Sequence, residues 1–592
     1  MKKRWFRMTL SAVLILSLMT SCKRIEVFQK GKATDANGEE MTWDEYTEDF
    51  FVSSITEDAL TMHYFIQYPE NFGIDEYEDT LGTIYSEEPE EDQYTWASDA
   101  LKELEAYPDS TLTDQQKLDK ETLTWYLETE KMGEDEKFAY YKEYAAPMYG
   151  IQSNLPINFA NYAFNEPTDV DHYLALLDDV PRYMNELFLY EQEKANRGYG
   201  MADYLIDQVI EECSDFLGES VEDNVLVTTF DERIDSLSLE SGKAEEYKAS
   251  NMKKVEESVF PAYQDFMSNM ETLKGMCKGS GALPEFEHGK EYFEYLARGA
   301  SSSDRTVEEL KELLQNYIDQ QYGEITMMAM ADPDLLSKMD DPDYGAEDPV
   351  DILELIASRM GNVLVPDIGS AKYTVRYVPK SLEGSSNPAF CFIPQIDNVE
   401  SAIYINQSPE YEHMDFFITV AHEGYPGHMY QNTYYYGTDP AHFRYILDFS
   451  GYTEGWAVYI SYRALELSDI EDASIQRLLA LDSALGYEFS ALADIGVNYE
   501  GWTQEELADF FEEYGLSGGD IEDLYYQLIS TPGVYLSYSA AACEIWDLQK
   551  YAMEKLGEDY NDVDFHRIIL DAGPTSFSIL KERVDEFAAS RS

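Results

Sequence analysis

The sequence predicts a mainly α-helical protein with a small β-sheet. From about Trp43 to Met360, apolar residues recur three and four positions apart, as in Tyr173–Leu187. This is the period of helices that bury one face. A stretch of alternating β-rich residues follows at Lys372–Val378, and two more strand candidates lie at Ala389–Ile393 and Ala402–Asn406. The sheet is thus expected just before the stretch at residues 413–442, in which histidines are clustered.

Residues 1–22 have the features of a bacterial lipoprotein signal peptide. A basic start, residues 1–7, precedes a mostly apolar run, residues 8–19, that is too short to cross a bilayer as a helix. Small residues directly before Cys22 resemble a lipobox, at which the peptide is cleaved and a lipid caps the cysteine. Met19 is not the commonest residue at its lipobox position, so a plainly secreted form is the alternative. We expect a protein that is extracytoplasmic and anchored to the cell membrane by a lipid on Cys22.

The chain is strongly acidic. Lys and Arg number 42 against 116 Asp and Glu, which gives a formal net charge of −74. Such a surface repels nucleic acid and anionic lipid headgroups, so we expect no nucleic-acid partner. The hydrophobic content of 44%, with 47 Tyr and 28 Phe, is enough for large cores and excludes a disordered chain. The four cysteines after Cys22 are far apart, which favours neither a disulfide framework nor a cysteine zinc site.

The chain divides by composition into four parts. The signal peptide is followed by a polar tether at residues 23–42, a helical part at residues 43–370, and a part at residues 371–592 that carries the sheet and the candidate site. We expect the last two parts to form one continuous catalytic unit. The sequence contains no internal repeat, P-loop, nucleophile elbow or dinucleotide fingerprint. No feature of the sequence indicates an oligomeric state.

Histidines are scarce and clustered. The chain has 8 in 592 residues, and four of them, His413, His422, His428 and His442, lie between residues 413 and 442. His422 is followed directly by Glu423. Zinc-assisted hydrolases use neutral imidazoles to hold the metal and a neighbouring carboxylate to take a proton from the bound water.

The spacing of the two central histidines is unusual. In the common H-E-x-x-H pattern the histidines are four apart, about 40° from each other around a helix. His428 is six positions after His422, which is about 240° around an unbroken helix. Pro426 lacks an N–H, and Gly427 accepts backbone angles that other residues avoid. We therefore expect residues 424–427 to break the helix and return His428 toward the metal. The alternative is a helix that ends at Pro426 and carries two surface histidines.

A second stretch, Tyr452–Tyr459, supplies a third candidate ligand. It reads Tyr-Thr-Glu-Gly-Trp-Ala-Val-Tyr, and Glu454 fits the carboxylate that often joins two histidines on zinc. The His-Glu-x-x-Pro-Gly-His-x-x-Gln segment at 422–431 and Glu-Gly-Trp-Ala at 454–457 together resemble the bacterial family called domain of unknown function 885. That family is distantly similar to zinc metallopeptidases of the thimet oligopeptidase and carboxypeptidase Taq type. The resemblance covers roughly residues 43–588, and it implies a large helical metallopeptidase-like fold with the small sheet beside the active-site cleft.

The resemblance also points to a tyrosine downstream. Pro532-Gly533, followed by Ser537-Tyr538, matches a family segment, and the hydroxyl of Tyr538 is the candidate donor to the oxyanion of a tetrahedral intermediate. A structural role for Tyr535 or Tyr538 is the alternative. The chain departs from the family pattern at Asn498, where a histidine is expected, and at Val534, where a glutamine is common.

The sequence thus predicts a zinc hydrolase, a metallopeptidase that acts on peptide substrates. His422, His428 and Glu454 bind Zn²⁺, and Glu423 acts as general base and then as acid. Asp448 or Asp494 is a candidate to orient a ligand histidine. The sheet either accepts an extended peptide along its edge or is a purely structural ribbon. Two other functions stay open: a non-catalytic ligand-binding lipoprotein on the same fold, and a glycosidase that uses a carboxylate pair.

Overall fold

The structure is a computed structural model that describes residues 40–86, 94–218, 220–339, 342–409, 416–516 and 521–591, apart from a few side chains within these ranges. The predicted signal peptide with Cys22 and nearly all of the predicted tether lie outside these residues. His413 does too. None of the helices within the described ranges is both long and apolar enough to span a membrane.

Helices build the chain before the sheet, as the apolar periodicity predicts. They are α1 (Trp43–Ile55), α2 (Ala59–Phe65), α3 (Trp96–Leu104), α4 (Asp114–Gly133), α5 (Ile151–Asn161), α6 (Pro167–Asn196), α7 (Asp203–Leu217), α8 (Val225–Ser236), α9 (Lys243–Lys254), α10 (Phe260–Glu271), α11 (Gly289–Ser301), α12 (Val307–Ala331), α13 (Leu335–Lys338) and α14 (Pro349–Met360). Several begin at capping boxes. In α12, for example, Thr306 accepts from the backbone N–H of Glu309 while the Glu309 carboxylate accepts from that of Thr306.

The predicted sheet is present and has three strands. They are β1 (Tyr373–Tyr377), β2 (Ala389–Phe392) and β3 (Ser401–Ile405), in the order β1-β3-β2. β3 pairs with β1 in parallel and with β2 in antiparallel fashion. β2 is therefore an edge strand, and it packs against the helix that carries His422. The fold class predicted from the sequence is confirmed.

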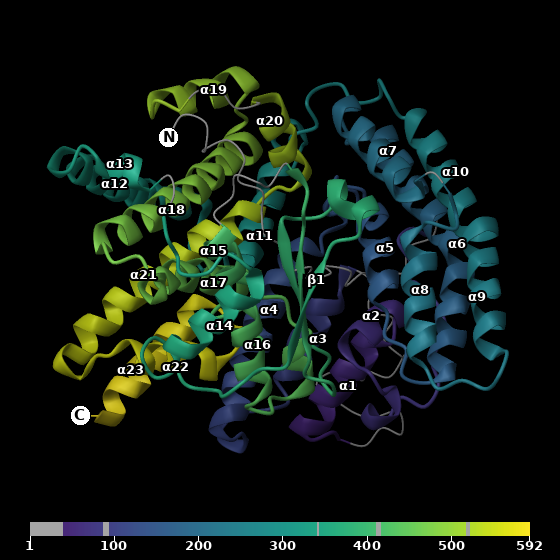
Figure 1. The fold of residues 1–592 in the computed structure, drawn as a ribbon, viewed down its shortest axis with the longest axis horizontal. Helices are drawn as coiled ribbons and strands as arrows, with labels where there is room; N and C mark the ends of the chain where they lie inside the picture. Colours follow the sequence, from purple (N-terminus) through teal and green to yellow (C-terminus); the bar gives the residue numbers. More distant parts are fainter. Residues whose placement is uncertain are drawn as a thin grey trace.

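The chain after the sheet is helical again. Its helices are α15 (Phe416–Glu423), α16 (His428–Tyr436), α17 (Ser450–Ala464), α18 (Ala473–Ile495), α19 (Gln504–Glu513), α20 (Ile521–Ser530), α21 (Val534–Leu556), α22 (Asp562–Ala572) and α23 (Phe577–Arg591). Helices α6 to α10 pack together on one flank of the molecule, and α12, α18 and α21 pack on the other, with β1 between the flanks (Figure 1).

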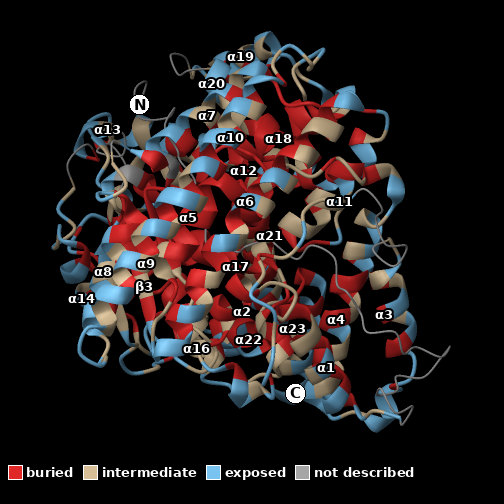
Figure 2. Ribbon diagram, turned by 90° about the vertical axis from the view of Figure 1, so that its right-hand side faces the viewer, coloured by how far each residue is buried: buried red, intermediate tan, exposed pale blue. Residues whose placement is uncertain are grey.

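Helix α17 lies in the middle of the core. It is buried around almost its whole circumference, from Gly451 to Tyr462, as expected of a helix surrounded by others. Figure 2 shows the buried residues concentrated around α17 and α21. The two helices pack closely because Gly455 lacks a side chain: a Cβ there would lie 2.7 Å from the Cβ of Ala541. Glu454 is thus carried by a firmly held helix.

Candidate metal centre

The break between α15 and α16 brings the two histidines together. Helix α15 ends at Glu423, and α16 begins at His428. Across the break, Gly427 N–H donates to Ala421 and Tyr430 N–H donates to Gly424. These hydrogen bonds each span six residues, whereas those of an unbroken helix span four. Two extra residues are accommodated in this way, and His428 returns to the side of His422.

Glycine is required at position 427 because the backbone of His422 approaches it closely. A Cβ at this position would lie 1.8 Å from the carbonyl oxygen of His422, which no side chain tolerates. The neighbouring peptide is held from α17, because the indole Nε1 of Trp456 donates to the Pro426 carbonyl at 3.1 Å. The helix that carries Glu454 therefore also fixes the loop that positions His428.

His422, His428 and Glu454 converge in the buried interior. The Nε2 atoms of the two histidines lie 3.0 Å apart. The Oε2 atom of Glu454 lies 3.3 Å from His422 Nε2 and 3.4 Å from His428 Nε2. Both histidines are buried, with 3% and 0% of their surface exposed, so neither is the surface histidine of the alternative interpretation.

The carboxylate of Glu454 is held in its charged form. Burial alone would raise its pKa, but the charge of His428 and hydrogen bonds from both histidines outweigh this and lower the pKa to about 2. A charged carboxylate between two imidazole nitrogens is a donor set that is able to hold a metal cation.

Glu423 lies beside this group rather than between the histidines. One of its carboxylate oxygens and the ring nitrogens of His422 and His428 all lie within 4.8 Å of one another. Glu454 approaches both nitrogens more closely, so Glu454 lies between the two histidines and Glu423 lies beside them. Glu423 is fully buried, and burial raises its pKa to about 7 against the lowering effect of the His422 charge.

Tyr538 faces the same group from α21. Its ring lies 6.2 Å from that of His422 at an interplanar angle of 15°, and it stacks on Tyr487 at 5.5 Å. Burial raises the pKa of the Tyr538 hydroxyl well above its usual value, and the carboxylates of Glu454 and Glu423 add to the rise. The hydroxyl therefore stays protonated and keeps its ability to donate a hydrogen bond.

Other residues that the sequence singled out lie elsewhere. Asp494 is used at the start of α21, where it accepts from Gly533 N–H at 2.9 Å and from the side chain of Asn498 at 2.9 Å. The hydrogen bonds of its carboxylate go to Asn498 and Gly533, and none of those described joins it to His422 or His428. Asn498, the departure from the family pattern, thus has a structural role. His442 contacts Glu48 at 2.8 Å.

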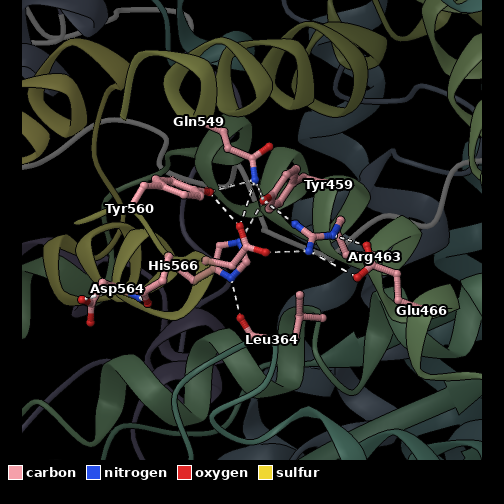
Figure 3. A network of polar contacts seen from close by, with 10 residues as sticks. Leu364, Tyr459, Arg463, Glu466, Gln549, Tyr560, Asp564 and His566 are labelled. Atoms are coloured by element: carbon pink, nitrogen blue, oxygen red, sulfur yellow. Dashed lines mark hydrogen bonds and ion pairs between the residues drawn. The ribbon is translucent and has the colours of Figure 1, made fainter. Parts of the chain in front are cut away.

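A network behind α17 supports the site and has no obvious sequence signal (Figure 3). His566 of α22 is fully buried; its Nδ1 contacts the Leu364 carbonyl at 2.7 Å and its Nε2 contacts the Tyr459 hydroxyl at 2.8 Å. Burial lowers the pKa of His566 to about 4, so the ring is neutral at pH 7. The ring packs edge-on against Trp456 at 5.5 Å. The network therefore supports the indole that holds Pro426.

A cavity of about 1000 Å³ reaches the candidate site. Glu454 and Tyr538 line it, together with Asp448 and with Phe390 of the edge strand β2. The sheet thus lies beside a cleft, and a substrate in the cavity would reach the carboxylate that joins the two histidines.

The match to a family model covers most of the chain. The model for bacterial proteins of unknown function called DUF885 matches residues 69–584. The chain therefore belongs to this family, and the resemblance inferred from the His-Glu-x-x-Pro-Gly-His and Glu-Gly-Trp-Ala motifs is confirmed. The search of curated proteins found no significant match.

Two solved structures of bacterial proteins share this fold. A candidate lipoprotein from Colwellia psychrerythraea aligns with a TM-score of 0.80 and 17% identity, over 93% of this chain and 100% of that one. A candidate lipoprotein of unknown function from Shewanella oneidensis aligns with a TM-score of 0.58 and 15% identity, over 92% and 99%. A candidate oligoendopeptidase F from Bacillus anthracis reaches a TM-score of 0.32 at 13% identity, over 85% and 93%.

Proposed function

We propose that the protein is a zinc-dependent hydrolase, a metallopeptidase with His422, His428 and Glu454 as its metal ligands. The observation that carries this proposal is the spacing of the three donor atoms. In a tetrahedral zinc site with bonds of about 2.0 Å, ligand atoms lie about 3.3 Å apart. The three separations in the structure are 3.0, 3.3 and 3.4 Å. Three protein ligands leave a fourth position for water or substrate, which is the pattern of catalytic zinc sites.

Glu423 is the group that moves the proton. Zinc bound at the site would polarise the scissile carbonyl and lower the pKa of the attacking water. The Glu423 carboxylate takes one proton from that water as the oxygen bonds to the carbonyl carbon. It then delivers the proton to the nitrogen of the leaving amine as the C–N bond breaks. The Tyr538 hydroxyl donates a hydrogen bond to the oxyanion that forms between these steps.

The shape of the cleft supports a peptide as substrate. β2 is an edge strand, and Phe390 within it and Ile393 directly after it line the cavity. An extended peptide can add to such an edge through main-chain hydrogen bonds. The proposed metal ligands, general base and oxyanion donor suit hydrolysis of an amide bond. They also give the two histidines a role, whereas a glycosidase that uses a carboxylate pair would have no use for them.

Metal analysis combined with a peptide-library digest tests the proposal. We expect about one zinc ion per purified chain, and mass spectrometry of a digested synthetic peptide library should reveal cleaved products. A chelator should abolish cleavage, and added Zn²⁺ should restore it. Cleavage that survives complete removal of metal would contradict the proposal. A zinc-loaded chain that cleaves no peptide would favour the non-catalytic lipoprotein.

We also propose that Cys22 carries a lipid that anchors the protein to the membrane outside the cytoplasm. The two structures with the higher TM-scores are described as candidate lipoproteins, which supports the lipobox interpretation. Replacing Cys22 by Ala should move the protein from the membrane fraction to the soluble fraction, as judged by immunoblotting of fractionated cells. A wild-type chain found in the cytoplasm would contradict this proposal.

A further inference from the structure

The charged side chains that line the cavity next to Glu454 are mostly acidic. Eight carboxylates and two cationic side chains lie on its wall. Most of them have partners: Glu143 is paired with Lys194, and Glu186 with Arg182 at 2.6 Å. One of the two cations, Arg444, is paired with Asp119 at 2.7 Å. These charges are therefore neutralised within the protein.

Four of the eight carboxylates have no Lys, Arg or His at ion-pair distance among the described residues. Two of these, Asp58 and Glu134, accept hydrogen bonds from the backbone N–H groups of Leu60 and Ala97. The other two are Glu130 and Asp448. Glu130, on α4, receives a long hydrogen bond of 3.4 Å from the Tyr295 hydroxyl. The Oδ1 atom of Asp448, two residues before α17, is buried and has no hydrogen-bond partner among the described residues. Within the part of the chain that the structure describes, no Lys or Arg lies at ion-pair distance from either carboxylate.

The two carboxylates lie on neighbouring elements. The rings of Trp125 in α4 and Phe449 at the start of α17 pack 5.4 Å apart, which brings the two elements together. Burial raises the pKa of Glu130 to about 7, and the charge of Asp448 adds to the rise, while Lys142 opposes it. The ammonium of Lys142 lies 5.0 Å from the centre of the Tyr144 ring. A single ammonium cannot balance both carboxylates.

A second, independent observation points to a ligand rich in hydrogen-bond donors. Asn158 and Asn387 line the same cavity and are only 6% and 8% exposed. The Oδ1 atom of each has no hydrogen-bond partner among the described residues. Buried oxygens are rarely left unpaired in proteins, because an unmade hydrogen bond in the interior is costly. An incoming group with several N–H donors would satisfy them.

We propose that this cavity binds a positively charged nitrogen group of the substrate, with Glu130 and Asp448 as the specificity-determining residues. The group is either the free amino terminus of a peptide or a lysine or arginine side chain. Both present a cation with several donors, which suits two uncompensated carboxylates and unpaired amide oxygens. A substrate end that carries a carboxylate would be repelled. The inference rests on the proposed peptidase function and names the substrate class for that site.

Equilibrium dialysis of a peptide library tests the inference independently of turnover. The full chain with Glu423→Gln is dialysed against three forms of one synthetic library, and mass spectrometry measures retention. The forms are unmodified, acetylated at the amino terminus, and built without Lys and Arg. Hydrogen bonds to charged groups contribute enough for about a tenfold difference in binding. We expect about tenfold weaker retention of the acetylated form if the amino terminus is bound, or of the form without Lys and Arg if a side chain is bound.

Substitutions assign the effect to the two carboxylates. Glu130→Gln and Asp448→Asn, each added to the Glu423→Gln chain, should abolish the preference for the cationic form. Glu128→Gln, on the exposed side of the same helix α4, removes the same charge outside the cavity and should leave the preference unchanged. Circular dichroism checks that each variant folds. If Glu130→Gln does not fold, the loss or survival of the preference in Asp448→Asn tests the inference.

The outcomes separate this inference from the proposed function. Equal retention of all three forms would overturn the inference, and so would a preference that survives both cavity substitutions. A failed peptidase proposal would appear differently, as a wild-type chain without zinc or without cleavage that still retains cationic peptides.

Discussion

Replacing Glu423 by Gln is expected to lower peptide hydrolysis by at least about two orders of magnitude, because proton transfer by a positioned side chain contributes about 10²–10⁴-fold to a rate. The amide keeps the shape of the carboxylate but cannot take a proton from water. Because Glu454 lies closer to both histidines than Glu423 does, bound zinc should stay near one ion per chain. Measuring kcat/KM together with zinc content separates chemistry from metal binding.

Glu400→Gln provides the matched control for this substitution. Glu400 is exposed, between β2 and β3, so the same chemical change there should leave hydrolysis and zinc unchanged. Loss of zinc on Glu423→Gln would recast Glu423 as a ligand. Unchanged hydrolysis would mean that the base lies elsewhere, and Asp448 would be the first described residue to test.

Replacing His428 by Ala is expected to remove both zinc and activity. Substitutions that only touch groups around a metal ligand cost about 10–100-fold in metal affinity or activity, and removing a ligand itself should cost more. Without His428, two donors remain, His422 and Glu454. Zinc content after dialysis against a weak chelator should fall close to zero, and hydrolysis should fall to the background of buffer.

His442→Ala tests whether the effect is specific to the site. His442 belongs to the same cluster of histidines in the sequence, but it contacts Glu48 outside the candidate centre. Its loss should leave zinc content and hydrolysis near the wild-type level. If His428→Ala retained zinc as well as His442→Ala does, the ligand assignment would be wrong.

Local sequence patterns were sufficient to predict the secondary structure around the site. The alternation at Lys372–Val378 predicts a strand, and the structure has one at Tyr373–Tyr377. Pro and Gly at residues 424–427 predict a break in the helix, and α15 ends at Glu423. Both features depend on neighbours along the chain, such as side chains that favour an extended backbone or a residue without an N–H.

The choice among similar residues could not be made from local pattern. Glu454 is one of 116 acidic residues, and only the family resemblance distinguished it. The same holds for Tyr535 and Tyr538, of which the structure places Tyr538 against His422. Asp494 was a candidate to orient a histidine, yet its carboxylate binds the start of α21. Each outcome depends on which helices pack together, and short-range periodicity does not contain that information.

By itself, the sequence determined the helical class, the small sheet, the break in the histidine helix and membership in the family, because each depends on neighbouring residues or on motif order. Only the tertiary structure decided that His428 returns to within 3.0 Å of His422. That return depends on the Trp456 indole of α17, on the close approach allowed by Gly427, and on hydrogen bonds that span six residues. The tertiary structure also brought Glu130 and Asp448 to one cavity, although they are far apart in the sequence. Contacts between distant segments are set by packing and by exclusion of water, which act between side chains that only the folding of the whole chain brings together.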